Sequence, residues 1–95
     1  MKTYLIADIS VHDMEKFNEY RQLVPEIIAK HGGQYLVRGG KSEVKEGRWQ
    51  PGRLVVIQFP SRKDAQAFLD DPEYAPIAQI RWAAAKTNLV LVDGL

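Results

Sequence analysis

Several short stretches of this chain are almost continuously apolar and are separated by polar segments. Residues 3–9, 53–59 and 88–92 are rich in β-branched, leucine and aromatic side chains. In each stretch, apolar residues occupy both alternating sets of positions, so both faces of the strand carry apolar side chains. This pattern predicts three strands that are buried on two sides of a sheet.

Residues 34–38 predict a further strand, which Gly39-Gly40 then interrupts. Paired glycines in a strand pattern indicate a bulge or a close approach of the backbone. The strand either ends at the glycine pair or continues over residues 42–45, and the sequence leaves both possibilities open. A loop rich in glycine and proline follows at residues 46–52, with Trp49 near its tip.

Helical spacing predicts one long helix between the first two strands. Its apolar stripe consists of Phe17, Tyr20, Val24, Ile27, Ile28 and His31. Asp13 is the expected N-cap and Gly32 the expected C-cap. Pro25 lacks a backbone N–H, so we expect a kink or a restart of the helix there.

A broken helix is predicted between the third and fourth strands. Ser61 and Asp64 resemble a capping box for a short helix that ends near Leu69. Asp71, followed by Pro72, is the expected cap of a second segment. The apolar face of that segment is expected at Ile77, Ile80 and Ala84.

The order of these elements is β-α-β-β-α-β, which predicts one ferredoxin-like α+β domain over residues 1–95. Right-handed crossovers give an antiparallel sheet of strand order 4-1-3-2, with both helical regions on one face. The other face would then expose several of Tyr4, Ile6, Leu54, Val56, Leu89 and Leu91. Such a patch exceeds what a monomer usually exposes. We therefore predict a two-fold homodimer through the open sheet face.

Composition narrows the function classes. The 95 residues include no cysteine, and the formal net charge is +1. The charge is too small to indicate a nucleic-acid or membrane partner, and two histidines without matching carboxylate spacing do not indicate a metal site. No apolar run is long enough for a signal peptide or a membrane helix, so we expect a cytoplasmic protein. No phosphate-binding or dinucleotide-binding motif is present, so no cofactor is expected.

Arginines are the strongest candidates for a binding site. Arg38 lies beside Gly39-Gly40, where backbone amides could approach an anion. Arg53 begins a buried strand, and Arg81 lies on or beside the apolar face of the last helix. A partly buried arginine needs an anionic partner. That partner is either a ligand or a structural carboxylate such as Asp8 or Asp13, and the sequence leaves both readings open.

Tyr20 and His12 are the candidate proton carriers, and Tyr74 is a candidate ligand-binding residue. Tyr20 lies on the helical stripe and is either a core residue or a catalytic one, whereas Tyr74 is harder to explain as core. His12 precedes the first helix and is the better placed general base. His31 at the C-terminus of that helix fits a stabilising role. Trp49 is expected to contact a partner subunit.

A set of short motifs runs through the whole chain. They are Arg38-Gly39-Gly40, Glu46-Gly47-x-Trp49-x-Pro51-x-Arg53, Phe59-Pro60-Ser61, Pro72-Glu73-Tyr74 and Arg81. With these motifs the chain resembles a family of small bacterial proteins in the dimeric α+β barrel superfamily, which is related to the antibiotic-biosynthesis monooxygenases. The resemblance implies a ferredoxin-like subunit and a two-fold dimer, without an established reaction. Gln58 stands where that family usually has glutamate.

These observations predict a homodimer that binds a small anionic or aromatic metabolite between the helices and the sheet. Any catalysis would be cofactor-free oxygenation or isomerisation of an enolisable substrate, with Arg38 and Arg81 holding the developing charge and His12 or Tyr20 moving a proton. The alternative is a non-catalytic binding or interaction module whose arginines pair with Asp8, Asp13 and Asp70-Asp71. A haem-binding variant with His31 as ligand is a third reading, which the resemblance allows.

Overall fold

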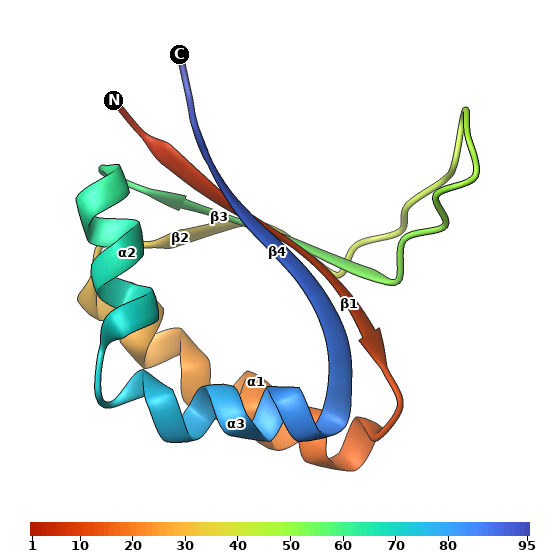
Figure 1. Cartoon of the computed structure of the whole chain (residues 1–95), viewed down its shortest axis with the longest axis horizontal. Coiled ribbons are helices and arrows are strands. Elements are labelled where there is room, and N and C mark those ends of the chain that lie inside the picture. Colours follow the sequence, from red (N-terminus) through yellow and green to blue (C-terminus); the bar gives the residue numbers. More distant parts are fainter.

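Four strands form one antiparallel sheet, and three helices cover one of its faces (Figure 1). The computed structural model describes all residues, 1–95. The elements are β1 (Thr3–Val11), α1 (Met14–Lys30), β2 (Gln34–Arg38), β3 (Arg53–Phe59), α2 (Arg62–Asp70), α3 (Tyr74–Ala84) and β4 (Ala85–Asp93). The strand order is β2-β3-β1-β4, so the predicted ferredoxin-like α+β fold and its order 4-1-3-2 are confirmed.

The core lies between the sheet and the helices. In β1, Leu5, Ala7 and Ile9 are buried and alternate with half-buried residues, and Val55, Ile57 and Phe59 do the same in β3. Leu5 is paired with Ile57 and Ala7 with Val55, so the two strands present one continuous apolar surface to the helices. Full burial at every second residue follows the pleat of the sheet, so within this chain only the helix side of these strands is fully buried, whereas the sequence predicted burial on both sides.

β4 differs from the prediction in length and in the face that each residue occupies. It begins at Ala85, directly after α3. Leu89 and Leu91 pair with Ala7 and Leu5 on the helix side, so placing them on the open face was wrong. Val90 and Val92 point the other way and are exposed. Because the side-chain period of a strand is two, a shift of one residue exchanges the faces.

α1 begins after the predicted N-cap Asp13, and its C-cap is His31, one residue before the predicted Gly32. The Asp13 carboxylate accepts a hydrogen bond from the backbone N–H of Lys16. At the other end, the N–H of Gly33 bonds to the carbonyl of Ile28, and the N–H of Gly32 bonds to the carbonyl of Ala29. This pair of bonds is a Schellman motif, and the positive φ of Gly32 permits it. The helix is continuous through Pro25 and does not restart there.

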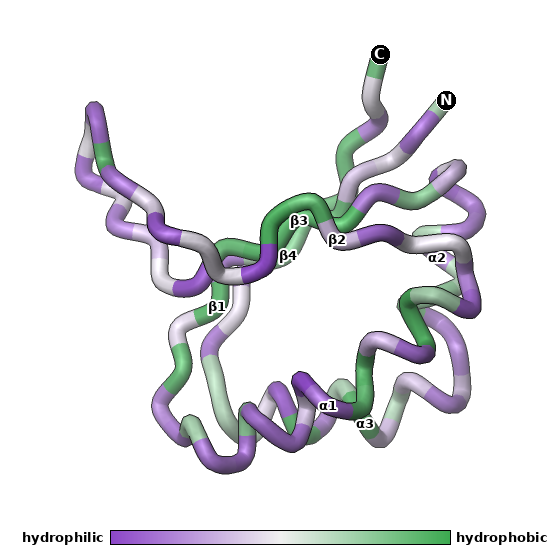
Figure 2. The backbone as a smooth tube through the Cα atoms, turned by 180° about the vertical axis from the view of Figure 1, so that it is seen from behind, coloured by the Kyte–Doolittle hydropathy of each residue, from purple (hydrophilic) through white to green (hydrophobic).

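β2 ends at Arg38, and residues 42–45 do not continue it. The irregularity in its pairing with β3 lies between Tyr35 and Val37, so the bulge precedes the glycine pair. Residues 39–52 form an arm that projects away from the body of the molecule (Figures 1 and 2). Residues 41–50 of this arm are exposed, and no strand pairs with them.

Asp8 ties the base of the arm to β1. One carboxylate oxygen accepts a hydrogen bond of 2.8 Å from the indole Nε1 of Trp49, and the other accepts one of 2.8 Å from the backbone N–H of Gly52. The Trp49 side chain is otherwise exposed, at 61%. Asp8 alternates with the buried residues of β1, so these bonds lie on the open side of the sheet.

The second helical region is broken as predicted, with a different buried face. The Ser61 hydroxyl accepts from the N–H of Asp64 and donates to its carboxylate. α3 begins at Tyr74, two residues after Pro72. Its buried residues are Tyr74, Ala78, Arg81 and Ala84, whereas Ile77 and Ile80 are half-buried. The predicted face is therefore rotated, and an arginine takes a place in the core.

The face of the sheet that the helices leave open is largely apolar. It carries Tyr4, Ile6, Leu54, Val56, Val90 and Val92. No helix of this structure is long and apolar enough to span a lipid bilayer.

Candidate functional site

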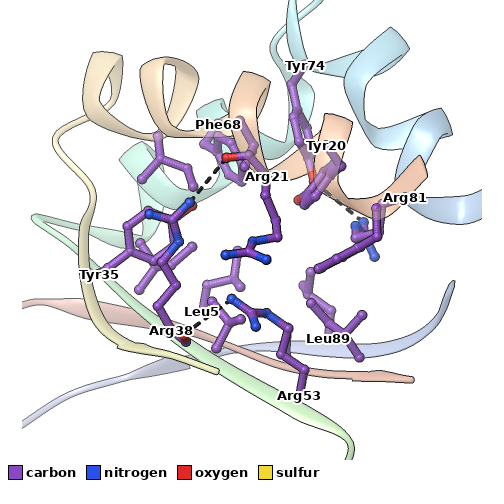
Figure 3. Close-up of a pocket in the computed structure, with 17 residues that line it drawn as sticks. Leu5, Tyr20, Arg21, Tyr35, Arg38, Arg53, Phe68, Tyr74, Arg81 and Leu89 are labelled. Atoms are coloured by element: carbon purple, nitrogen blue, oxygen red, sulfur yellow. Dashed lines mark hydrogen bonds between the residues drawn. The ribbon is translucent and has the colours of Figure 1, made fainter. Parts of the chain in front are cut away.

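A cavity opens between the sheet and the helices, toward the β2 edge of the sheet (Figure 3). Residues of β1, β2, β3, β4 and all three helices line it, and most of them are apolar. Its volume is about 40 Å³ for the centres of water-sized molecules, which accommodates a few waters.

Four arginines and no carboxylate line this cavity. Arg21 comes from α1, Arg38 from β2, Arg53 from β3 and Arg81 from α3. The salt bridges of the chain join other residues, and none includes any of these four guanidiniums. The site therefore combines an apolar interior with uncompensated positive charge, which favours an anionic ligand.

Arg81 lies at the inner end of the cavity and is only 6% exposed. Its Nη2 donates to the Tyr74 hydroxyl at 3.5 Å, and its buried Nε has no partner. The Tyr20 and Tyr74 hydroxyls are 3.0 Å apart and hydrogen-bonded. Burial raises the pKa of the Tyr20 phenol, and Tyr74 beside it raises that pKa further. Tyr20 therefore stays protonated and acts as a hydrogen-bond donor at neutral pH.

Arg21, Arg38 and Arg53 form the outer end (Figure 3). Arg53 donates to the backbone carbonyl of Arg38 at 3.3 Å, and Arg38 donates to the backbone carbonyl of Arg21 at 3.2 Å. Backbone carbonyls hold these side chains together without neutralising them. Burial lowers the pKa of Arg53, and the charges of Arg21 and Arg38 lower it further.

An aromatic wall accompanies the outer arginines. The Arg38 guanidinium lies 4.6 Å from the centre of the Tyr35 ring, and that of Arg53 lies 5.8 Å from the centre of the Phe17 ring. Burial raises the pKa of the Tyr35 phenol. The aromatic faces attract the cations and orient them along the cavity.

Gly39 makes room for Arg53. The φ of Gly39 is +72°, and a Cβ atom there would overlap the Arg53 guanidinium. Its N–H donates to the carbonyl of Leu54 at 2.7 Å, so this amide is already engaged and does not face an anion. Gly40 faces open space. The need for glycine at position 39 is therefore steric and conformational.

The structure brings most of the predicted site residues to one cavity. Arg38, Arg53, Arg81, Tyr20 and Tyr74 all line it. His12 does not: its side chain is exposed, and its backbone N–H donates to the carbonyl of Ala84.

His31 also lies outside the cavity lining. Its Nε2 is 2.7 Å from a carboxylate oxygen of Asp71. This contact occupies the nitrogen that would ligate haem iron, so the residue does not fit that role.

The carboxylates that were expected to neutralise the arginines have other partners. Asp8 binds Trp49 and Gly52, Asp13 caps α1, and Asp71 binds Lys30 and His31. Asp70 accepts from Gln66. Within this chain none of these carboxylates pairs with a cavity arginine, so the structural pairing that the sequence left open as one reading is wrong.

Two site residues, Arg21 and Tyr35, were missed in the sequence. Arg21 follows Phe17 by four residues and precedes Val24 by three, so it falls on the buried stripe of α1. A charged residue on that stripe was the available signal. Tyr35 gave no such signal in the sequence, because the bulge after it disturbs the alternation that assigns strand residues to the two faces of the sheet.

The fold and cavity define a ferredoxin-like α+β protein with an arginine-lined site between helices and sheet. The profile of the family described as a domain of unknown function, DUF1330, matches residues 2–95. The chain belongs to this family, which agrees with the resemblance seen in its motifs. Among proteins of curated function, none matches the sequence significantly.

Solved structures share the fold at low sequence identity. A protein of unknown function from Rhodopseudomonas palustris superposes with a TM-score of 0.83 at 15% identity, over 99% of this chain and 82% of that one. SnoaB, a cofactor-independent oxygenase from Streptomyces nogalater, gives a TM-score of 0.72 at 14% identity, over 99% and 93%. A Nitrosomonas europaea protein provisionally assigned as an antibiotic biosynthesis monooxygenase gives 0.62 at 18%, over 100% and 99%. These likenesses establish the architecture.

Proposed function

We propose that this protein is a homodimer that binds a small aromatic or enolisable anion in the arginine-lined cavity. The observation that carries the proposal is the buried Arg81 guanidinium, which has no carboxylate partner and an unsatisfied Nε. Burying an unpaired charge is costly. A bound anion offsets that cost and supplies the missing hydrogen-bond acceptor.

The chemistry that fits this site is cofactor-free oxygenation or isomerisation of an enolisable substrate. Both reactions pass through a substrate anion, and guanidiniums in a water-poor cavity stabilise such an anion. Arg38 and Arg81 hold the developing charge in this proposal, and Tyr20 with Tyr74 donates hydrogen bonds to it. The activity of SnoaB, a cofactor-independent oxygenase with this fold, is compatible with oxygenation.

A second proposal is a binding protein without turnover. It is favoured by the absence of a histidine or carboxylate among the residues that line the cavity. Catalysis by deprotonation needs an acceptor within hydrogen-bond reach of the substrate, directly or through one water. The two proposals share the anion site and differ in whether the bound molecule is consumed.

The open sheet face supports the homodimer. Val56, Ile6 and Val90 are in register across β3, β1 and β4, and they form the centre of an apolar strip. A second copy can pack the same strip against it in a two-fold arrangement. The projecting arm lies beside this face (Figure 1), so Trp49 is positioned to contact the partner.

The proposed anion site can be tested with 4-nitrophenol, whose anion absorbs visible light. Arginines that stabilise an anion lower the apparent pKa of the bound phenol. We expect bound nitrophenol to ionise at a lower pH than the free molecule, and Arg81→Met to abolish the difference. Arg62→Met is the control, because Arg62 pairs with Asp93 away from the cavity. An unchanged pKa on binding would contradict the proposal.

Incubation under oxygen separates turnover from binding. Oxygen consumption with an enolisable phenol, dependent on Arg81, supports the oxygenase. Isomerisation would convert an enolisable substrate without oxygen uptake. Binding without oxygen consumption and without isomerisation supports a binding protein without turnover.

A further inference from the structure

The arginines of the cavity fall into two groups at opposite ends. Arg21, Arg38 and Arg53 gather at the outer end, whereas Arg81 lies alone at the inner end beside Tyr20 and Tyr74 (Figure 3). Each end has a buried guanidinium nitrogen without a partner, the Nε of Arg21 and the Nε of Arg81. Two separated donors without acceptors indicate that the ligand has an acceptor oxygen at each end.

The wall between the two ends is apolar and aromatic. Leu5 and Ile57 lie on its sheet side, and Phe17 and Phe68 lie on its helix side. Aromatic rings are well suited to this middle part, because they bury a large apolar area and stack against Phe17 and Tyr35. A flexible hydrophilic chain would leave its polar groups unpaired here.

The two ends differ in charge and in exposure. The outer end has three guanidiniums; Arg38 is exposed, and Arg21 and Arg53 are half-buried. It suits a carboxylate, which carries a full charge and loses little hydration there. A second polar depression next to it is lined by Asn18, Arg21, Gln22 and Arg38, so the outer end opens to solvent.

The inner end has one guanidinium and two hydroxyls. Tyr20 and Tyr74 share one proton in their mutual bond, which leaves one hydroxyl proton free to donate. Together with Arg81 this end therefore offers mainly donors. It suits a phenolic, enolic or carbonyl oxygen, which loses less on burial than a carboxylate does.

From this polarity we propose that the ligand is an aromatic carboxylate with a phenolic or enolisable oxygen at its far end. The carboxylate binds Arg21, Arg38 and Arg53, and the far oxygen binds Arg81 and the tyrosine pair. This inference rests on the proposed function, because it names the class of anion that the site takes. It also places the reacting oxygen at the inner end, away from solvent.

Three simple probes test it: 4-hydroxybenzoate, which has both groups, and benzoate and phenol, which have one each. The readout is the Nε–H resonance of each arginine in 15N-labelled protein. Arg48 and Arg62 lie outside the cavity and serve as internal references. We expect 4-hydroxybenzoate to shift Arg21 and Arg81 with one saturation curve. Benzoate should shift Arg21, Arg38 and Arg53 but not Arg81, and phenol should shift Arg81 alone.

The affinities should follow the same division. Loss of a hydrogen bond to a charged group costs about ten-fold or more in affinity, so each one-ended probe should bind at least about ten-fold more weakly than 4-hydroxybenzoate. Arg81→Met should reduce 4-hydroxybenzoate to the affinity of benzoate and leave benzoate itself unchanged. Arg53→Met should weaken benzoate and leave phenol unchanged.

The outcomes distinguish this inference from the proposed function. If benzoate shifts Arg81 as strongly as Arg21, or if 4-hydroxybenzoate binds no more tightly than benzoate, the two-ended site is wrong and the anion site stands. If no probe shifts any cavity arginine relative to Arg48 and Arg62, both fail.

Discussion

At the scale of single residues, Arg81 is the most informative side chain of the molecule. It occupies a core position of α3, where its neighbours Ala78 and Ala84 are small. A buried guanidinium without an ionic partner lowers the stability of the folded state. Its position is therefore better explained by a ligand than by folding.

Replacing Arg81 should separate stability from binding. We expect Arg81→Met to leave the free energy of unfolding unchanged or to raise it by about 1 kcal/mol, because an unpaired buried charge is removed. The same change should reduce the affinity for an anionic probe at least about ten-fold. Urea unfolding and probe titration measure the two effects. A large loss of stability without loss of binding would show that Arg81 is a structural residue.

The glycine pair gives a second, internally controlled test. Gly39→Ala should destabilise the fold by about 1–2 kcal/mol, because an L-residue is strained at the positive φ of this position. It should also displace the Arg53 guanidinium and weaken carboxylate binding. Gly40→Ala should change stability by less than about 0.5 kcal/mol, since nothing lies near its Cβ position. Equal effects of the two changes in unfolding experiments would refute this role of Gly39.

The sequence contained part of this information at the residue level. Arg38, Arg53 and Arg81 could be singled out because arginine is unusual beside buried strands and on apolar helix faces. The sequence predicted that Arg38 and Arg81 act on one ligand. Whether Arg38 reaches Arg53 and Arg81 depended on where β2 ends, which the sequence left open and the structure places at Arg38. The role of Gly39 was misassigned, because only the three-dimensional packing reveals that Arg53 passes over it.

At the scale of elements, Asp71 joins the three helices. It is 6% exposed and ends α2, its carboxylate accepts from the N–H of Glu73 ahead of α3, and it contacts Lys30 and His31 at the end of α1. The hydrogen bond from His31 holds the pKa of this carboxyl well below its usual value, with further contributions from Glu73 and Lys30. Ionised Asp71 therefore stabilises the helical layer.

This junction predicts a pH dependence. A lowered pKa in the folded state contributes stability above the unfolded value of 3.8, and that stability is lost as the pH falls from there toward the folded pKa. Asp71→Asn should lower stability at neutral pH and flatten its acid dependence. Asp70→Asn is the control, because Asp70 accepts only from Gln66 of its own helix. Acid unfolding followed by circular dichroism measures the pH dependence of stability for both variants. Parallel unfolding curves for wild type and Asp71→Asn would contradict this role of Asp71.

The positions of the strands and helices were predicted from the sequence better than the contacts of single residues. Thr3–Val11, Gln34–Arg38 and Arg53–Phe59 match the predicted strands closely because β-branched, leucine and aromatic residues are concentrated there. Of the two possibilities left open for β2, the end at the glycine pair is correct and the continuation over residues 42–45 is wrong, because these residues lack a pairing strand within the chain. Their polar and apolar pattern resembled a strand, but a strand needs a hydrogen-bonded neighbour.

At the scale of the whole molecule, the sheet is covered on one face only. The helical layer buries Leu5, Ala7 and Ile9, while Val90 and Val92 on the opposite face remain 56% and 45% exposed. Together with Tyr4, Ile6, Leu54 and Val56 they form an apolar surface that a second copy can bury. The sequence also predicted an apolar open face, but it placed Leu89 and Leu91 there and not Val90 and Val92.

A charge on this face should prevent self-association. We expect Val90→Lys to shift the protein from dimer to monomer at micromolar concentration, because a lysine at the centre of an apolar interface loses its hydration. Leu23→Lys is the matched control, since Leu23 is 43% exposed on α1, outside the sheet. Sedimentation velocity measures the oligomeric state, and a wild-type monomer would refute the dimer.

The central claim is that the arginine-lined cavity binds a small anion, and native mass spectrometry of freshly purified protein tests it most directly. We predict that wild-type protein retains a small acidic molecule, one per chain, and that Arg81→Met retains none while Arg62→Met retains as much as the wild type. Equal retention by the wild type and Arg81→Met would contradict the claim, as would wild-type protein that carries no small molecule and takes up none of the anionic probes.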